Sequence, residues 1–139
     1  MLPISTTRFL VMWVALAATM SANGIFRELV LKRFANGAAA DAISATIGIL
    51  IIGVITRIGF RPIHAATSHS LAFASAMLVL LTVAFETAIG VSIDHKSIGQ
   101  LLEHYAIWRG ELWPIVLAFL AFTPYLWARL LPTRGVKSM

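Results

Sequence analysis

Four apolar stretches, each long enough to cross a lipid bilayer, constrain this chain more than any other feature of its sequence. A transmembrane helix needs about 20 mostly apolar residues, and the sequence holds such stretches at about 9–28, 38–56, 70–93 and 112–131. Of 139 residues, 59% are hydrophobic and only 12% are charged, whereas soluble domains carry about 25% charged residues. We therefore predict an all-α, polytopic membrane protein whose residues 1–139 form a single four-helix transmembrane bundle.

The first stretch is interpreted as a retained helix rather than a cleaved signal peptide. Its apolar core is longer than the roughly 7–15 residues of a signal peptide, no Ala-x-Ala site follows it, and the helix can continue to Phe34. The fourth stretch contains two prolines. Pro114 suits a first helical turn, whereas Pro124 lies in the interior and is expected to bend the helix, because it frees a backbone carbonyl one turn earlier.

An even number of spans places both termini on one side of the membrane, here called the terminal side and distinguished from the opposite side. Lys and Arg in short loops set the orientation, and the sequence places six on the terminal side and five on the opposite side. All six acidic residues lie on or near the opposite side, but acidic residues contribute little to orientation. The small excess favours cytoplasmic termini. The basic residues form no cluster, so nucleic-acid binding is not indicated.

The connection over residues 94–111 has a helical pattern of its own. Ser97 followed by Gln100 is typical of a capping box, and apolar residues then recur with helical spacing at Ile98, Leu101, Leu102, Tyr105 and Trp108. We predict a short amphipathic helix that lies in the membrane interface between the third and fourth spans; the alternative is an ordinary loop. Aromatic side chains would anchor this region at headgroup depth, namely Tyr105, Trp108 and Trp113.

Glu86 is the single charged residue of the third stretch. Counted back from Ile93, it lies roughly 10 Å inside the opposite-side end of that helix. An ionisable group near the membrane centre costs about 2.5–3.5 kcal/mol, so it usually faces the bundle and has a partner. The alternating helix directions bring further polar residues to the same half of the membrane. We predict one intramembrane polar cluster, composed of Asn23, Arg27, Glu28, Asp41, Ser44, Glu86 and Arg109.

Three interpretations of this cluster remain open. An ion pair between Arg27 and Glu86 would fix the packing of the helices. A desolvated Glu86 would instead mark a pocket that handles a proton or a ligand. The third interpretation is a polar patch on which a partner subunit docks.

Several kinds of chemistry find no support in the sequence. The chain has no cysteine, which excludes disulfides, cysteine-ligated zinc and iron–sulfur clusters. Its four histidines, His64, His69, His95 and His104, lie in loops or at a helix start, whereas a haem inside a bundle needs ligands on facing helices. Motifs of metalloproteases, phosphate loops and serine hydrolases are missing. We therefore expect no metal or cofactor, and nothing in the sequence indicates an enzyme.

Three short motifs in this order resemble a group of small, four-helix, uncharacterised bacterial inner-membrane proteins. The motifs are Asn-Gly-x-x-Arg-Glu from Asn23, Phe-Glu-x-x-x-Gly from Phe85, and Leu-Leu-x-x-Tyr from Leu101, which leads to Gly-x-Leu-Trp-Pro from Gly110. Two positions depart from the group, which has Asn and Arg where this chain has Ala106 and Glu111. The resemblance implies a bacterial inner membrane and draws attention to Asn23, Arg27, Glu28 and Glu86, but it implies no activity.

Three functions are compatible with these features. The first is a non-enzymatic accessory, assembly or scaffold subunit of a larger membrane complex. The alternative is a small homo-oligomeric transporter or channel that uses Glu86 as its coupling or gating carboxylate. The second alternative is a lipid- or quinone-binding membrane protein. The expected partners are thus the bilayer and either other membrane subunits or further copies of this chain.

Overall fold

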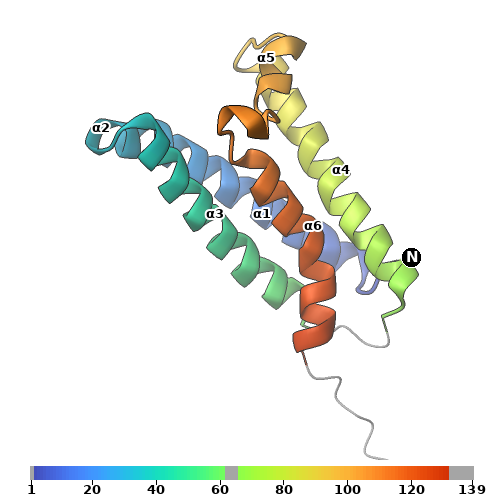
Figure 1. The fold of residues 1–139 in the computed structure, drawn as a ribbon. Coiled ribbons are helices and arrows are strands. Elements are labelled where there is room, and N and C mark those ends of the chain that lie inside the picture. Colours follow the sequence, from blue (N-terminus) through green and yellow to red (C-terminus); the bar gives the residue numbers. More distant parts are fainter. Residues whose placement is uncertain (1, 62–65, 132–139) are drawn as a thin grey trace, which may run out of the picture.

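All regular elements that the structure describes are helices. The structure is a computed structural model that describes residues 2–61 and 66–131. Four of its helices are long and apolar enough to cross a membrane: Thr6–Phe34, α3 (Gly37–Gly59), α4 (Ser68–Ser92) and α6 (Trp113–Leu130). The predicted four-helix fold is confirmed, and the chain is a multi-pass membrane protein (Figure 1). The last three spans begin and end close to the expected residues, whereas the first extends beyond residue 28 to Phe34.

The first span is a continuous helix with one irregular turn. α1 (Thr6–Phe26) passes into a π-helical turn over Arg27–Leu31 and ends in α2 (Lys32–Phe34), so the predicted continuation to Phe34 is confirmed. The chain then turns sharply, because Ala35 is extended and the Asn36 side chain accepts a hydrogen bond from the Ala39 N–H at 2.8 Å. This cap begins α3 directly, so α3 returns antiparallel to α1.

The four spans form a bundle in which three of the four pairs of neighbouring helices pack closely. α1 packs on α3, α3 on α6, and α6 on α4, whereas α1 and α4 contact each other over a much smaller area. Figure 1 shows α1 and α4 starting near one another and diverging toward the ends that carry α2 and α5. The bundle is therefore compact on the terminal side and opens on the opposite side.

Close contacts hold the terminal end together. Gly59 lets the backbone of α3 approach α1, because a Cβ at this position would overlap the side chain of Met12. The Arg8 guanidinium donates hydrogen bonds of 2.8 Å to the carbonyls of Gly59 and Ile58, the last carbonyls of α3, which have no partner within the helix. The buried apolar cluster lies mainly in this half: Ile4, Phe9, Met12, Leu16, Ile52, Phe60, Ala74, Leu78, Val116 and Leu120.

The carbonyl that the internal proline of α6 leaves without an N–H partner is satisfied by a side chain. Pro124 has no N–H to offer the Leu120 carbonyl, and this carbonyl instead accepts a hydrogen bond of 2.7 Å from the Thr123 hydroxyl. The neighbouring Ala121 carbonyl accepts one of 2.6 Å from Ser75 on α4. The helix changes direction along its second half, as the proline predicted (Figure 1).

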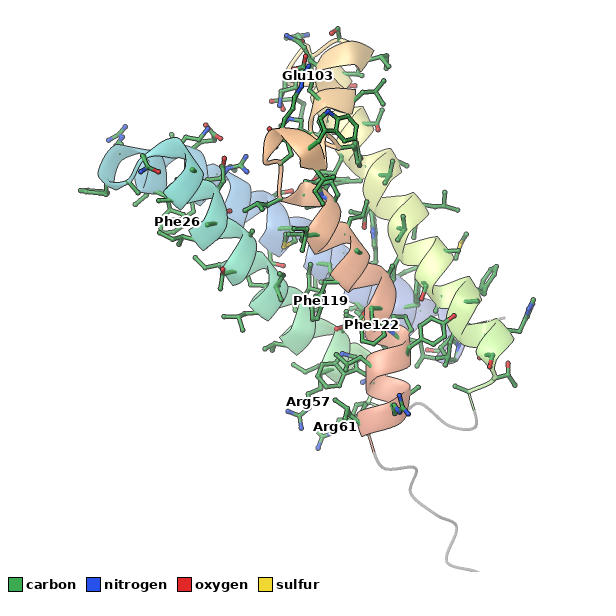
Figure 2. All side chains as sticks on the ribbon, in the orientation of Figure 1. Phe26, Arg57, Arg61, Glu103, Phe119 and Phe122 are labelled. Atoms are coloured by element: carbon green, nitrogen blue, oxygen red, sulfur yellow. The ribbon has the colours of Figure 1, made fainter. Side chains whose placement is uncertain are left out.

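The outer surface is that of a protein solvated by lipid. Large apolar side chains are exposed along all four spans, and Figure 2 shows Phe26 and Phe122 among the side chains that project away from the bundle. Charged side chains lie at the two ends, with Arg57 and Arg61 at one end and Glu103 at the other (Figure 2). Apolar surface of this extent would be unfavourable in water, but it is the expected solvent-facing surface in a bilayer.

The segment between α4 and α6 contains the predicted short helix, but this helix is shorter than the apolar pattern through Trp108 indicated. The capping box of Ser97 and Gln100 is present and begins α5 (Ile98–Glu103), but the helix ends there and a 3-10 turn follows over Ile107–Arg109. A continuous helix over 98–108 would carry the chain about 16 Å in one direction. The chain must instead return to α6, which packs on α4, and Gly110 completes the reversal with a φ of 85°.

The three expected aromatic anchors differ in their surroundings. Trp108 is 81% exposed, which suits a side chain at the membrane interface. Tyr105 is half-buried, and Trp113 points into the bundle, where it lines a cavity described below.

The contact between Met12 and Gly59 predicts a position-specific effect on stability. Gly59→Ala should lower the free energy of unfolding by about 1–3 kcal/mol, because the added methyl group overpacks a tight helix contact. Gly53→Ala on the same helix is the matched control, since its Cβ would meet only Phe119 at an ordinary 3.9 Å. Unfolding of the purified variants in detergent, followed by circular dichroism, measures both; equal stability of the two variants would contradict the prediction.

Candidate functional site

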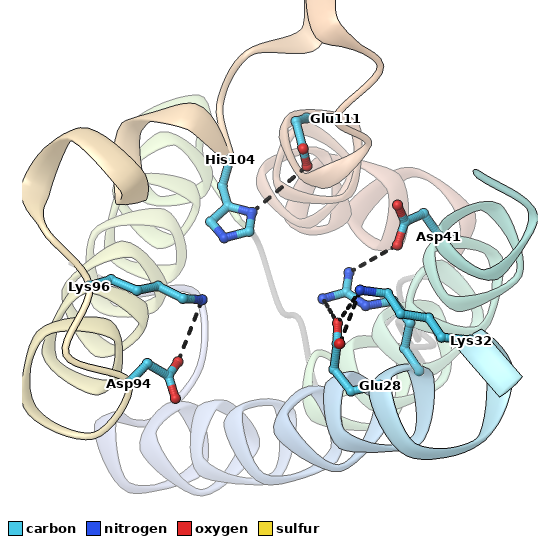
Figure 3. A network of polar contacts seen from close by, with 8 residues as sticks. Glu28, Lys32, Asp41, Asp94, Lys96, His104 and Glu111 are labelled. Atoms are coloured by element: carbon cyan, nitrogen blue, oxygen red, sulfur yellow. Dashed lines mark hydrogen bonds and ion pairs between the residues drawn. The ribbon is translucent and has the colours of Figure 1, made fainter. Parts of the chain in front are cut away.

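Five of the seven residues of the predicted polar cluster meet at the opposite-side end of α1 and α3. The Asn23 side-chain amide donates a hydrogen bond of 2.9 Å to the Ser44 carbonyl, inside the α1–α3 interface. The Arg27 guanidinium lies 3.6 Å from Asp41 and 3.3 Å from Glu28, whose carboxylate also binds Lys32 at 2.8 Å. Figure 3 shows this network beside α3. The structure therefore brings these five residues together at one end of the α1–α3 pair.

Two buried polar atoms of this group have no hydrogen-bond partner within the described part of the chain. They are the Asn23 side-chain oxygen, on a residue that is only 7% exposed, and the Nε of Arg27. The two residues lie one turn apart, directly before and at the start of the π-helical turn. Buried polar groups are normally satisfied, so this end of the α1–α3 interface retains unused hydrogen-bonding capacity.

The structure does not form the expected ion pair between Arg27 and Glu86. Arg27 binds Asp41 and Glu28 instead, and no Lys, Arg or His of the described residues has a nitrogen within 4 Å of the Glu86 carboxylate. The physical reason is the divergence of α1 from α4, which leaves α3 as the neighbour within reach of Arg27. Arg109 is also apart from the cluster: it lies 3.8 Å from Glu103, and both side chains are well exposed.

Glu86 lines a narrow apolar cavity in the middle of the bundle. The cavity has a volume of about 20 Å³, which is room for roughly one water molecule. All four spans contribute to its wall, and Glu86 is the only charged residue in it among residues 2–61 and 66–131; the others are Trp13, Leu16, Ala17, Met20, Ile52, Thr82, Phe85, Trp113, Val116, Leu117 and Leu120. A single carboxylate therefore lies against a wall that offers almost no compensating polar groups.

The main contact between α1 and α4 lies directly beside Glu86. The Trp13 indole N–H donates a hydrogen bond of 3.3 Å to the Thr82 hydroxyl, and its ring meets Phe85 edge-on with centroids 5.8 Å apart. Glu86 follows one turn after Thr82 and is exposed, so its carboxylate lies where the two helices begin to separate. Trp13 was not among the residues predicted for the site. The available signal was a tryptophan inside an apolar span, since this residue is usually enriched at the interface.

Contacts between acidic and basic side chains lie at the opposite-side end of the bundle, beyond Glu86. Lys96 lies 3.6 Å from Asp94, and His104 Nδ1 lies 3.7 Å from Glu111. In Figure 3 these pairs face the Glu28 group across the space between the helices. Gly90 holds this region to α4, because the side chain of Leu101 packs against it so closely that a Cβ would clash. The acidic side chains at this end thus have basic neighbours. Glu86 lies deeper and has no basic nitrogen within 4 Å among the described residues.

Metal ligation is not suggested by the described part of the chain. Within residues 2–61 and 66–131, no group of three or more His, Asp or Glu side chains is arranged to hold a metal ion. His69 lies in the first turn of α4 and His104 ends α5. His64, together with Arg134 and Lys137 of the orientation count, lies outside the described residues.

Comparisons of this chain with models of protein families, with curated proteins and with solved structures found no match. The resemblance to small bacterial inner-membrane proteins therefore stays a prediction from the sequence motifs.

The reassigned ion pair can be tested with double-mutant cycles. Arg27→Gln combined with Asp41→Asn should show a coupling energy of a few tenths to about 1 kcal/mol, the range of partly exposed pairs. Arg27→Gln combined with Glu86→Gln should be additive, because these two residues are not in contact. Unfolding in detergent supplies the four free energies of each cycle, and a larger coupling to Glu86 than to Asp41 would restore the original expectation.

Proposed function

We propose that this protein is a non-enzymatic accessory subunit that helps to assemble or scaffold a larger membrane complex. The observation that carries the proposal is the unpaired Glu86 carboxylate, exposed where α1 and α4 separate within the membrane-spanning part of the bundle. A charge inside a bilayer is costly and normally has a partner. A protein that leaves such a group without one among its described residues has a reason to bind another membrane protein there.

Two further features support an assembly role. The apolar residues exposed on every span offer ample surface for helix–helix contacts. The buried oxygen of Asn23 and the Nε of Arg27 add unused hydrogen-bonding groups in the same half of the membrane. Neither feature requires a substrate, a cofactor or a conformational cycle.

The proposal predicts the behaviour of the protein extracted gently from native membranes. On a native gel it should migrate with stoichiometric amounts of other subunits, which mass spectrometry of the band identifies. Glu86→Gln should lower the co-migrating fraction by roughly tenfold, since polar contacts between membrane helices contribute about 1–2 kcal/mol. Glu103→Gln, which neutralises an exposed carboxylate on α5, should leave the complex intact. Isolation of a lone monomer or a pure homo-oligomer would refute the accessory role.

A second candidate is a small homo-oligomeric transporter or channel. The cavity lined by all four spans, with Glu86 as the single charged residue that the structure describes in its wall, favours this function. In that case Glu86→Gln would leave folding and oligomerisation unchanged and abolish a flux across reconstituted vesicles. The native-gel experiment separates the two candidates, because only the accessory role requires other subunits.

We further propose that the protein lies in a bacterial inner membrane with both termini in the cytoplasm. The sequence motifs support the first part and the excess of Lys and Arg on the terminal side, six against five, supports the second. The chain has no cysteine, so single cysteines can report the orientation. In intact cells an impermeant maleimide should label Trp108→Cys on the opposite side and leave Arg61→Cys on the terminal side unlabelled until the cells are lysed. The reverse pattern would invert the topology.

A further inference from the structure

We propose that the opening between α1 and α4 receives a transmembrane helix of the partner, and that this helix presents a lysine or arginine to Glu86. This inference rests on the proposed accessory function and names the chemistry of its partner. It follows from three properties of the opening: its shape, its size and its charge.

The shape comes from the way α1 and α4 separate. The two helices touch where Trp13 meets Thr82 and Phe85, and they diverge beyond that contact toward the opposite side (Figure 1). The other neighbouring spans pack along their lengths. Beyond their contact, α1 and α4 therefore pack little against each other, and the sides that they turn toward one another are available to a third helix, since side chains of one helix fill the grooves of another.

The size of the cavity excludes larger occupants of its interior. About 20 Å³ accommodates a water molecule or the end of one side chain, but not a quinone ring or a lipid headgroup. A helix is about 10 Å across, so it would lie outside the cavity, against α1 and α4, and extend a single side chain toward Glu86. A long, flexible side chain meets this requirement best.

The charge of the opening specifies that side chain. In the described part of the chain, Glu86 is the only charged residue in the cavity wall. The nearby basic groups have other acidic neighbours: Arg27 has Asp41 and Glu28, Lys96 has Asp94, and His104 has Glu111. A carboxylate in a low-dielectric environment is stabilised most by an opposite charge. Glu86 lies six residues before the end of α4, about 9 Å along the helix axis. The basic residue should therefore lie at that depth from the opposite side.

The experiment uses a designed helix in place of the unidentified partner. A single-span peptide of leucine and alanine, with one lysine about 9 Å from its opposite-side end, is reconstituted with the full-length protein in phosphatidylcholine vesicles. Energy transfer from a dye on Arg61→Cys to a dye on the peptide reports association. We expect the lysine peptide to bind roughly tenfold more tightly than the all-apolar peptide. This preference should vanish in Glu86→Gln and persist in Glu103→Gln.

Two further experiments test whether binding depends on the position of the lysine in the peptide and on the charge of residue 86. A peptide whose lysine lies at the same depth from the terminal side should bind no better than the all-apolar peptide. This comparison uses only the protein with Glu86 intact. Glu86→Lys should reverse the preference, so that a peptide with glutamate at the matching depth binds better than the lysine peptide. Circular dichroism and gel filtration establish that each variant is folded. If Glu86→Gln does not fold, the position of the lysine decides the question.

The inference would be overturned if both peptides bind equally, or if the lysine peptide keeps its advantage in Glu86→Gln. It would also be overturned if copies of this chain associate through Glu86 and the peptide leaves their association unchanged, which identifies a second copy as the occupant. The peptide experiment and the native-gel experiment test different claims. A protein that is found alone in the membrane refutes the accessory function, whereas failure of the peptide refutes only the partner chemistry.

Discussion

A polar group inside a bilayer must find a hydrogen-bond partner within the protein, because lipid offers none. This constraint accounts for most polar side chains of the four spans. Thr123 satisfies the carbonyl that Pro124 leaves free, Ser75 joins α4 to α6, and Thr56 accepts the indole N–H of Trp127 at 2.9 Å. Each bond ties a polar group to a definite place in the packing. Glu86 departs from the rule, which is why the candidate site lies there.

The two ends of the bundle differ in how tightly the helices meet. At the terminal end, the Gly59 contact with Met12 and the bonds from Arg8 to the last carbonyls of α3 draw α1 and α3 together. At the opposite end, α1 turns toward α3, where Arg27 binds Asp41. The consequence is that α1 and α4 diverge toward the opposite side (Figure 1). Ion pairs lie at that end, and deeper inside is Glu86, whose carboxylate has no ion-pair partner among the described residues.

Much of the fold could be predicted from the sequence, because the length of an apolar stretch is itself the physical requirement for crossing a bilayer. Helix caps could also be predicted from the sequence, as the capping box of Ser97 and Gln100 shows. The polar cluster was predictable in part, since helix direction places Asn23, Arg27 and Asp41 in the same half of the membrane. Which charges pair was not predictable, because it depends on the angle between helices. Trp13 and Trp113 were missed as wall residues of the cavity for the same reason.

The sequence by itself determined the four spans, their alternating directions and the depth of Glu86, because each follows from hydrophobicity and from the rise of a helix per residue. The tertiary structure alone decided that Arg27 binds Asp41 rather than Glu86, that the segment after α4 folds back after six helical residues, and that α1 and α4 separate around a carboxylate. These features depend on how close two helices approach. That distance is set by contacts between residues far apart in the chain, such as Met12 with Gly59.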